Sequence, residues 1–252
     1  IYMGDWSSDV CSSDLALNRL LGTVKLELRR TSDSRGEYTV CEPYGYRTYS
    51  PWLEESFDQE HGSASLRTLV TSDRRYVLQR FAEQALHLVG DFAECGVYRG
   101  GTAYLLARVL SASPKSLHLF DTFSGMPDAA AADPSGHVVG DFGDTSLDSV
   151  KALLAPFAGV VCHRGVIPET FRDIAPDARF ALVHLDVDLY QSVRDGLEFF
   201  YPRLVPGGIV VVDDYGFEMY REAARRAVDE FFAAKREKPL VLRTGQCVVV
   251  RL

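Results

Sequence analysis

The segments FALVHLDVD (residues 180–188) and GIVVVDD (residues 208–214) are apolar runs that each end in aspartates. An unbroken apolar run of this length is typical of a parallel strand that is covered by helices on both faces. Similar runs recur along the chain, with helical patterns between most of them: residues 92–97, 116–121, 160–165, 239–244 and 247–252. This alternation predicts a doubly wound α/β sheet.

The last two runs, PLVLRT and CVVVRL, are separated by a short turn at Gly245. A parallel crossover needs a dozen or more residues, so we expect these two strands to form a hairpin. The predicted architecture is therefore a Rossmann-like sheet that is mostly parallel and has an antiparallel strand at its end. Ligands of such sheets bind at the carboxyl ends of the strands.

Composition excludes several classes of protein. The chain has 252 residues, of which 46% are hydrophobic and 25% charged, as in an ordinary globular protein. Its net charge of −8 argues against nucleic-acid binding, and it has no apolar run of the roughly 18 residues that a membrane helix needs. The five cysteines form no CxxC pair and we find no secretory leader, so we expect a cytoplasmic protein without a disulfide framework.

The aspartates at the ends of the two quoted segments predict a metal site. Asp186 and Asp188 follow one strand, and Asp213 and Asp214 follow the next. Carboxylates that converge at one sheet edge repel one another by about 4 kcal/mol per pair at 4 Å, for an effective dielectric constant near 20. Oxygen ligands without nearby Cys or His pairs favour Mg²⁺, then Mn²⁺ or Ca²⁺. The alternative is that these aspartates cap helices or form turns.

The stretch ECGVYRGGT (residues 94–102) predicts a second binding element, a glycine-rich turn between a strand and a helix. Tyr98 occupies the position where the dinucleotide-binding pattern requires glycine, which argues against a nicotinamide cofactor. Asp121 ends the following strand, where a carboxylate is suited to accept hydrogen bonds from ribose hydroxyls. An adenosine-bearing ligand fits this arrangement, and a purely structural βα turn is the alternative.

Four segments in this order, GDFAECGVYRGGTA, LFDTFSGMP, HLDVDLY and FFYPRLVPGGIVVVDDY, resemble the macrocin O-methyltransferase (TylF-type) family over roughly residues 66–252. The resemblance implies the class I methyltransferase fold. It also implies Mg²⁺-dependent transfer of the methyl group of S-adenosylmethionine to a hydroxyl of a small molecule, often a sugar of a natural product. A homodimer or higher homo-oligomer is expected by the same analogy.

The resemblance also assigns roles by position. The glycine-rich turn would hold the methionine part of the cofactor. The end of the next strand would bind the ribose of the cofactor, and the turns that follow would bind its adenine. The residues so assigned are Glu94, Gly96, Arg99, Gly100, Thr102, Asp121, Phe123, Ser124, Gly165 and Val166. Asp186, Asp213 and Asp214 match the metal ligands of the family, and Asp188 matches its general base. Asp186 and Asp188 are both candidates for catalysis, and which of them is base rather than ligand stays open.

Three regions are expected along the chain. Residues 1–15 lack helical or strand periodicity, and their string DWSSDVCSSDL resembles a translated sequencing adapter, so we interpret them as an artefact. Residues 16–89 are predicted to form a cap or lid, with a strand at Thr23–Arg29, aromatic loops over 38–62 and a helix over 66–89 that the polar run at 71–73 could break or cap. The aromatic side chains either stack on the acceptor or pack the cap. Residues 90–252 form the predicted methyltransferase domain.

Most of the histidines, and Cys95 in the glycine-rich turn, are interpreted as structural residues. His118, His137, His163 and His184 show no metal or triad spacing, and Cys95 is expected to be a small buried residue of the turn. Two other functions stay open. One is a metal-dependent methyltransferase of catechols or other phenols, and the other is a non-catalytic protein that binds S-adenosylmethionine.

Overall fold

The computed structural model describes residues 27–30, 38–41, 51–53, 57 and 67–252. The chain divides into two compact units, Ile1–Glu60 and His61–Leu252. In the first unit, β1 (Glu27–Arg30) pairs antiparallel with β2 (Tyr38–Cys41), and a short 3-10 helix, η1, covers Pro51–Leu53. β1 overlaps the predicted strand, whereas β2 lies in a tract predicted as loops. Residues 1–15 and most of the aromatic tract lie outside the described residues.

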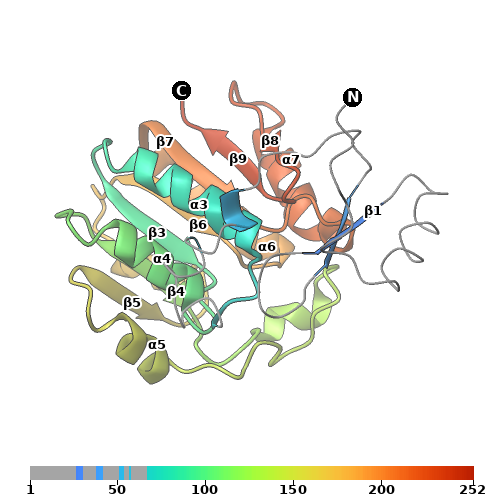
Figure 1. The fold of residues 1–252 in the computed structure, drawn as a ribbon, viewed down its shortest axis with the longest axis horizontal. Helices are drawn as coiled ribbons and strands as arrows, with labels where there is room; N and C mark the ends of the chain where they lie inside the picture. Colours follow the sequence, from blue (N-terminus) through green and yellow to red (C-terminus); the bar gives the residue numbers. More distant parts are fainter. Residues whose placement is uncertain (1–26, 31–37, 42–50, 54–56, 58–66) are drawn as a thin grey trace, which may run out of the picture. The chain divides into compact units, whose positions relative to one another are not determined.

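The second unit contains a seven-stranded sheet with the order β5-β4-β3-β6-β7-β9-β8 (Figure 1). Its strands are β3 (Asp91–Cys95), β4 (Leu117–Asp121), β5 (Val160–Arg164), β6 (Phe180–Leu185), β7 (Leu204–Val212), β8 (Leu240–Val241) and β9 (Cys247–Val250). The strands from β3 to β7 are parallel, while β9 runs antiparallel to β7 and pairs with β8 as a hairpin. The predicted mostly parallel sheet with an antiparallel end is confirmed.

The strand order explains where a ligand can bind. The chain proceeds outward from β3 to β4 and β5, and then returns to add β6 and β7 on the other side of β3. Connections on the two sides of this reversal leave the sheet in opposite directions, which opens a crevice beyond the carboxyl ends of β3 and β6. The predicted aspartates and the glycine-rich turn both lie at this edge.

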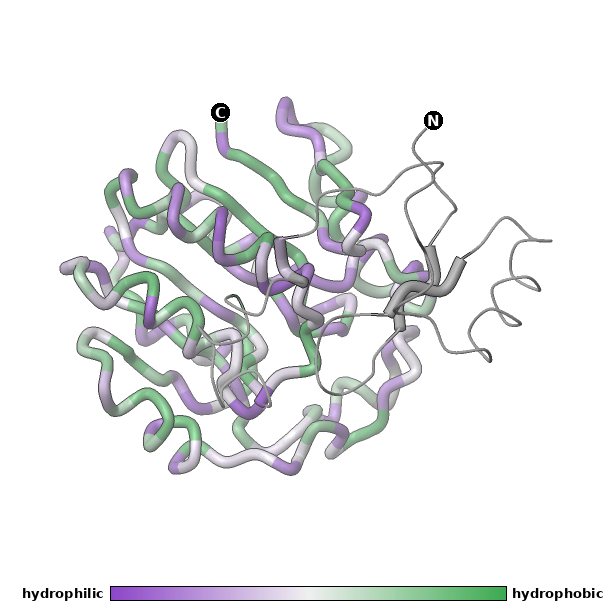
Figure 2. Tube along the Cα trace, in the orientation of Figure 1, coloured by the Kyte–Doolittle hydropathy of each residue, from purple (hydrophilic) through white to green (hydrophobic). Residues whose placement is uncertain are grey.

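Two helical layers cover the sheet. One face of the sheet is covered by α3 (Ser72–Ala85), α4 (Gly101–Val109) and α5 (Leu147–Leu154). The opposite face is covered by α6 (Tyr190–Phe200) and α7 (Arg226–Phe232), which pack on the alternate strand side chains. Figure 2 shows mostly hydrophobic strands between these layers and hydrophilic positions along the helices. Short 3-10 helices η3 (Asp128–Ala132), η4 (Glu169–Asp173), η5 (Tyr201–Arg203) and η6 (Glu218–Tyr220), and a π-helical turn, η7 (Arg221–Arg225), complete the unit.

The helix predicted over 66–89 is shorter in the structure. α3 begins at Ser72, after Thr71 in extended conformation, and the first helical hydrogen bond runs from Arg75 N to Thr71 O (2.9 Å). The polar run Thr71-Ser72-Asp73 favours a helix start over a helix interior, because these side chains compete for backbone hydrogen bonds. The apolar residues before it therefore lie outside α3, and Leu69 and Val70 line a cavity instead. Within the described residues, no helix is long and apolar enough to cross a membrane.

Candidate active site

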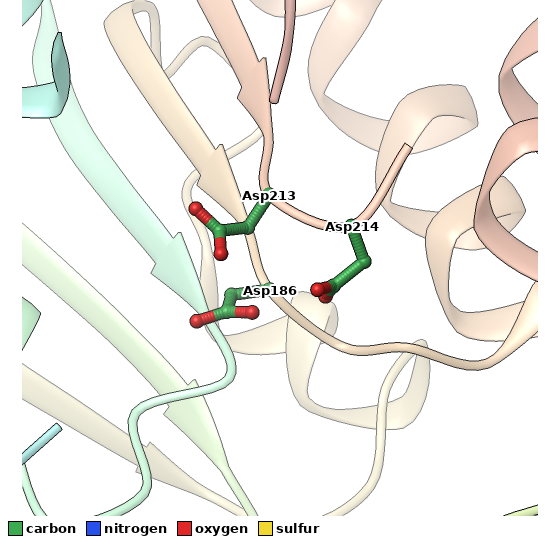
Figure 3. A group of neighbouring side chains, drawn as sticks. All are labelled: Asp186, Asp213 and Asp214. Carbon is green, nitrogen blue, oxygen red and sulfur yellow. The ribbon is translucent and has the colours of Figure 1, made fainter. Parts of the chain in front are cut away.

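Three carboxylates meet at the ends of two neighbouring strands. Asp186 follows β6, Asp213 and Asp214 follow β7, and the last residues of these strands, Leu185 and Val212, are partners in the sheet. One ligand oxygen from each aspartate lies within 4.8 Å of the other two. Figure 3 shows the three side chains converging from the two strand ends. The structure thus brings together the three aspartates that were predicted to bind a metal.

Burial and mutual repulsion disfavour the charged form of two of these groups. Burial, followed by the charge of Asp213, raises the pKa of Asp186 to about 8. Burial and the carboxylates of Asp186 and Asp188 also raise the pKa of Asp214 well above its ordinary value. Such shifts are expected where carboxylates share a desolvated site, and a divalent cation would reverse them.

The cluster also contains a cation that no sequence pattern indicated. Arg74, on the first turn of α3, is hydrogen-bonded through Nη1 to the carboxylate of Asp213, and the same atom lies 3.8 Å from Asp214 Oδ1. Its guanidinium also donates to Leu69 O (3.1 Å) and lies over the ring of Phe217. No local motif marks Arg74, because its partner Asp213 is 139 residues away in the chain. Only the packing of α3 beside β7 brings it there.

A buried polar network lies behind Asp213. His184 Nδ1 lies 2.9 Å from Glu94 Oε1, and His184 Nε2 lies 3.6 Å from Asp213 Oδ1; all three side chains are fully buried. Although burial opposes it, contact with the carboxylates of Asp213 and Glu94 raises the pKa of His184 to about 10. Gln246 also donates to Asp213 Oδ1 (2.8 Å). Despite its own burial, contact with His184 and Arg74 lowers the pKa of Asp213.

Asp188 occupies a different position from Asp186. It lies in a tight turn with φ of 56°, in the left-handed region that a residue with a side chain rarely adopts, and Leu189 N donates across this turn to Val187 O. Its buried carboxylate interacts with Asp214 and with the hydroxyl of Tyr220, and burial raises its pKa. Asp186, rather than Asp188, completes the three-carboxylate group with Asp213 and Asp214.

The glycine-rich turn packs against the end of β6 and is hydrogen-bonded to the end of β4. Gly96 has φ of +85°, and a Cβ atom added there would lie 1.7 Å from the carbonyl oxygen of Asp186. Asp121 Oδ2 accepts hydrogen bonds from Val97 N (2.7 Å) and Tyr98 N (3.0 Å), and its Oδ1 accepts one from Phe123 N (2.6 Å). Asp121 therefore fixes the turn itself, and it also faces the adjoining cavity.

A cavity of about 360 Å³ lies at this edge of the sheet. It is lined by the ends of β3, β4, β6 and β7, by the start of α3 and by the segment after β4. Eight predicted site residues border it: Gly96, Thr102, Asp121, Gly165, Val166, Asp186, Asp188 and Asp214. Its volume is in the range of small-molecule and cofactor sites. The structure thus places the glycine-rich turn and the aspartates around one space.

Six predicted site residues do not line this cavity: Glu94, Arg99, Gly100, Phe123, Ser124 and Asp213. Glu94 and Asp213 lie behind it in the buried network, and Phe123 is packed in the core. The half-exposed Arg99 is paired with Asp144, and Gly100 packs against Val150 and Leu153 of α5. Ser124 lines an adjoining hollow together with Gly165 and Val166. The cofactor contacts assigned to these residues stay predictions.

The sheet order, its antiparallel end and the crevice beyond β3 and β6 define the fold of a class I methyltransferase. A solved structure with this fold, that of the O-methyltransferase NovP, superposes with a TM-score of 0.62 at 24% identity, covering 73% of this chain and 82% of that one. The model of the family described as macrocin-O-methyltransferase (TylF) matches residues 63–251. The chain therefore belongs to the macrocin-O-methyltransferase family, as the sequence resemblance predicted.

Two relatives are enzymes named for O-methylation of natural products. One is the 8-demethyl-8-(2,3-dimethoxy-alpha-L-rhamnosyl)-tetracenomycin-C 4'-O-methyltransferase of Streptomyces olivaceus, 35% identical over 53% of this chain and 56% of its own length. The other is the mycinamicin III 3''-O-methyltransferase of Micromonospora griseorubida, 29% identical over 73% of this chain and 80% of its own length. The chain thus spans little more than half of the first relative.

Proposed function

We propose that this protein transfers the methyl group of S-adenosylmethionine to a hydroxyl of a sugar-bearing small molecule, with Mg²⁺ held by Asp186, Asp213 and Asp214. The observation that carries the proposal is the group of three carboxylates beside the cavity that the glycine-rich turn borders. The names of both relatives, one of which includes a rhamnosyl group, support a natural-product acceptor.

The donor set fits a hard divalent cation. Three carboxylates offer oxygen ligands within 4.8 Å of one another, and Asp186 and Asp214 border the cavity from which a substrate oxygen can approach. Mg²⁺ prefers such oxygen ligands and keeps positions open for water or substrate. Burial first, and neighbouring carboxylates second, raise the pKa of Asp186 and Asp214, and a bound cation would offset both effects.

The other side of the cavity fits S-adenosylmethionine. Gly96 lines this side of the cavity and allows the end of β3 to approach the Asp186 backbone closely. Asp121 faces the same cavity, and its three backbone partners leave about one of the four acceptor sites of the carboxylate for a ligand hydroxyl. Apolar side chains, among them Val97, Val166 and Ile167, offer a surface for an adenine ring.

The roles of the protein's own residues follow from this arrangement. When bound, S-adenosylmethionine would supply an electrophilic methyl group, and Mg²⁺ held by the three aspartates would supply positive charge that lowers the pKa of the acceptor hydroxyl. Asp188 takes up the hydroxyl proton at a carboxylate oxygen, and burial raises its pKa, which makes the carboxylate a stronger proton acceptor. The cavity walls align the two reactants and exclude water, which accounts for a large part of the rate in reactions of two bound molecules.

Binding and turnover test the proposal in two stages. S-adenosylmethionine is first titrated into the protein by calorimetry, with Mg²⁺ or with EDTA. Formation of S-adenosylhomocysteine is then measured with thymidine-diphosphate rhamnose, simple rhamnosides and catechol as acceptors. We expect binding in the micromolar range and turnover with a sugar acceptor that EDTA abolishes. Preference for catechol would favour the phenol-methylating alternative, and failure of the folded protein to bind the cofactor would contradict the methyltransferase function.

A paired substitution tests the metal site. Asp213→Ala combined with Asp214→Ala is expected to abolish turnover and Mn²⁺ binding while leaving affinity for S-adenosylmethionine largely intact. Asp177→Ala, at an exposed position far along the chain from these aspartates, is the matched control. Unchanged turnover in the paired variant would contradict the metal-dependent mechanism.

A further inference from the structure

The segment between β4 and α5 is tied to the surroundings of Asp188 at two points. Asp133 Oδ2 accepts a hydrogen bond from Tyr190 N (2.8 Å) at the start of α6, two residues after Asp188. His137 Nε2 lies 3.0 Å from the hydroxyl of Tyr220 in η6. Met126, Pro127 and Phe142 of the same segment line the cavity. The segment therefore forms part of the cavity wall and reaches the predicted base from two sides.

A continuous polar line runs from Asp188 to the protein surface. His137 Nε2 lies 3.0 Å from the Tyr220 hydroxyl and 3.9 Å from Asp188 Oδ2, and the Tyr220 hydroxyl interacts in turn with the Asp188 carboxylate. His137 Nδ1 lies 3.2 Å from Asp141 Oδ2, which also accepts a hydrogen bond from Val138 N (3.0 Å). The rings of His137 and Tyr220 are stacked, with centroids 5.8 Å apart. The contacts thus include both nitrogens of His137.

Hydrogen-bonding capacity limits the directions along this line. A charged Asp188 carboxylate only accepts, so Tyr220 can donate its single O–H to it. The Tyr220 oxygen and Asp141 can then both accept from His137 when the ring carries a proton on each nitrogen. Asp141 thereby orients the imidazole, the imidazole orients the hydroxyl, and the hydroxyl orients the carboxylate. Each member has a partner that holds it in one orientation.

The Asp188 carboxylate needs partners that fix its orientation, because a cation bound by the neighbouring aspartates would attract it. Its carboxylate adjoins Asp214, one of the three proposed metal ligands, and its backbone is in a conformation that side-chain-bearing residues rarely adopt. A freely rotating carboxylate at this position could turn toward the cation as a fourth ligand and would then be unavailable as a base. The Tyr220 hydroxyl gives one of its oxygens a different partner.

We infer that Tyr220 and His137 are positioning residues that hold the carboxylate of Asp188 in its orientation toward the acceptor hydroxyl. The inference rests on the proposed function, in which Asp188 takes up the hydroxyl proton. Neither residue belongs to the metal-binding group itself, which consists of Asp186, Asp213 and Asp214. The segment that carries His137 thus couples formation of the cavity wall to orientation of the base.

Single substitutions separate positioning from folding. Tyr220→Phe removes only the hydroxyl, and we expect kcat with the best sugar acceptor of the panel to fall about 10- to 100-fold, since a hydrogen bond to a charged group is lost. KM for that acceptor, affinity for S-adenosylmethionine and affinity for Mn²⁺ should stay nearly unchanged. Tyr190→Phe is the matched control, because it removes a hydroxyl that donates to Glu230 (2.6 Å) on α7. That variant should keep full kcat.

Rescue at position 137 tests the chain of contacts. His137→Leu should lower kcat as Tyr220→Phe does, whereas His137→Gln, which offers an N–H donor near the place of Nε2–H, should recover most of the loss. Full kcat in Tyr220→Phe, no recovery in His137→Gln, or a change confined to KM or Mn²⁺ affinity would overturn the inference. Asp188→Asn separates the two proposals. If Asp188→Asn is inactive while Tyr220→Phe is normal, only the positioning role fails, and if Asp188→Asn is fully active, the proposed base role fails.

Discussion

The guanidinium of Arg74 lies against the carboxylate of Asp213, so that a side chain from α3 supplies positive charge to the aspartates at the ends of β6 and β7. Arg74 Nη1 is close enough to contact both Asp213 and Asp214, two of the three proposed metal ligands. A divalent cation at the same carboxylates would feel its repulsion at short range. Arg74 and the metal therefore act on the same negative charge.

Replacement of Arg74 should strengthen metal binding. Arg74→Gln removes the competing charge, and we expect Mg²⁺ and Mn²⁺ to bind about tenfold more tightly, which corresponds to about 1.4 kcal/mol of relieved repulsion. Calorimetric titration of Mn²⁺ measures this directly. Arg80→Gln is the control, because Arg80 lies on the same helix and pairs with the partly exposed Glu83 instead. Equal or weaker binding by Arg74→Gln would show that Arg74 and the metal do not compete.

Metal binding should depend on pH through Asp186. Its pKa is raised to about 8, chiefly by burial, so the group holds a proton at neutral pH in the metal-free protein. A divalent ion must displace that proton, so its apparent affinity should increase as pH rises from 6 to 9 and level off above the pKa of Asp186. Mn²⁺ titrations at several pH values test this. An affinity that is constant over this range would mean that Asp186 is already ionised at pH 6.

The sheet and the aspartate cluster could be predicted because both depend on short local patterns. Each apolar run identifies a strand, and parallel strands bring their carboxyl ends to one edge, so Asp186, Asp213 and Asp214 had to converge. The short connection at Gly245 likewise required a hairpin. These inferences use only the order and spacing of residues near each strand end.

Contacts between distant segments could not be predicted in this way. Arg74, His137 and Tyr220 are unremarkable in the sequence, and each reaches the site through packing of a helix or loop on an element far along the chain. The predicted start of the helix at residue 66 was wrong because apolar periodicity continued through Leu69 and Val70, which line the cavity instead. Of these two residues only Val70 is buried and Leu69 is largely exposed, so the apolar spacing before Thr71 did not reflect a helix face packed on the core.

Gly96 should be among the least replaceable residues. In Gly96→Ala the new Cβ would lie 1.7 Å from the Asp186 carbonyl oxygen, so β3 and β6 would have to separate at the metal site. We expect a loss of stability of more than about 2 kcal/mol together with loss of Mn²⁺ binding. Gly136→Ala is the matched control, because Gly136 also has positive φ (+83°) but no neighbour within 4 Å of its added Cβ.

Positive φ alone costs about 1 kcal/mol for a residue with a Cβ atom, so Gly136→Ala isolates that effect from steric overlap. Urea unfolding of both variants, each with EDTA and with Mn²⁺, gives the comparison. Similar destabilisation in the two variants would mean that Asp186 moves without difficulty, and the close approach of the two strands would then contribute little to the site.

The Glu94–His184 pair should support the site through stability. Both side chains are fully buried and lie 2.9 Å apart (Nδ1 to Oε1), so Glu94→Gln leaves the charged His184 without one of its two carboxylate partners. We expect a loss of about 3 kcal/mol in the free energy of unfolding, as for other broken buried pairs. Glu198→Gln, at the more exposed pair with Arg194, should change stability by less than about 1 kcal/mol.

The pH dependence of this effect has a definite sign. The pKa of His184 is raised from 6.5 to about 10 in the folded protein, so folding takes up a proton between these values. Its contribution to stability is therefore fully present below about pH 6.5 and is lost as pH rises through 10. Urea unfolding in EDTA should show a larger difference between the unsubstituted protein and Glu94→Gln at pH 6 than at pH 9.5. A difference that grows with pH would mean that His184 is neutral in the folded protein, and the charge that lowers the pKa of Asp213 would then come from Arg74 alone.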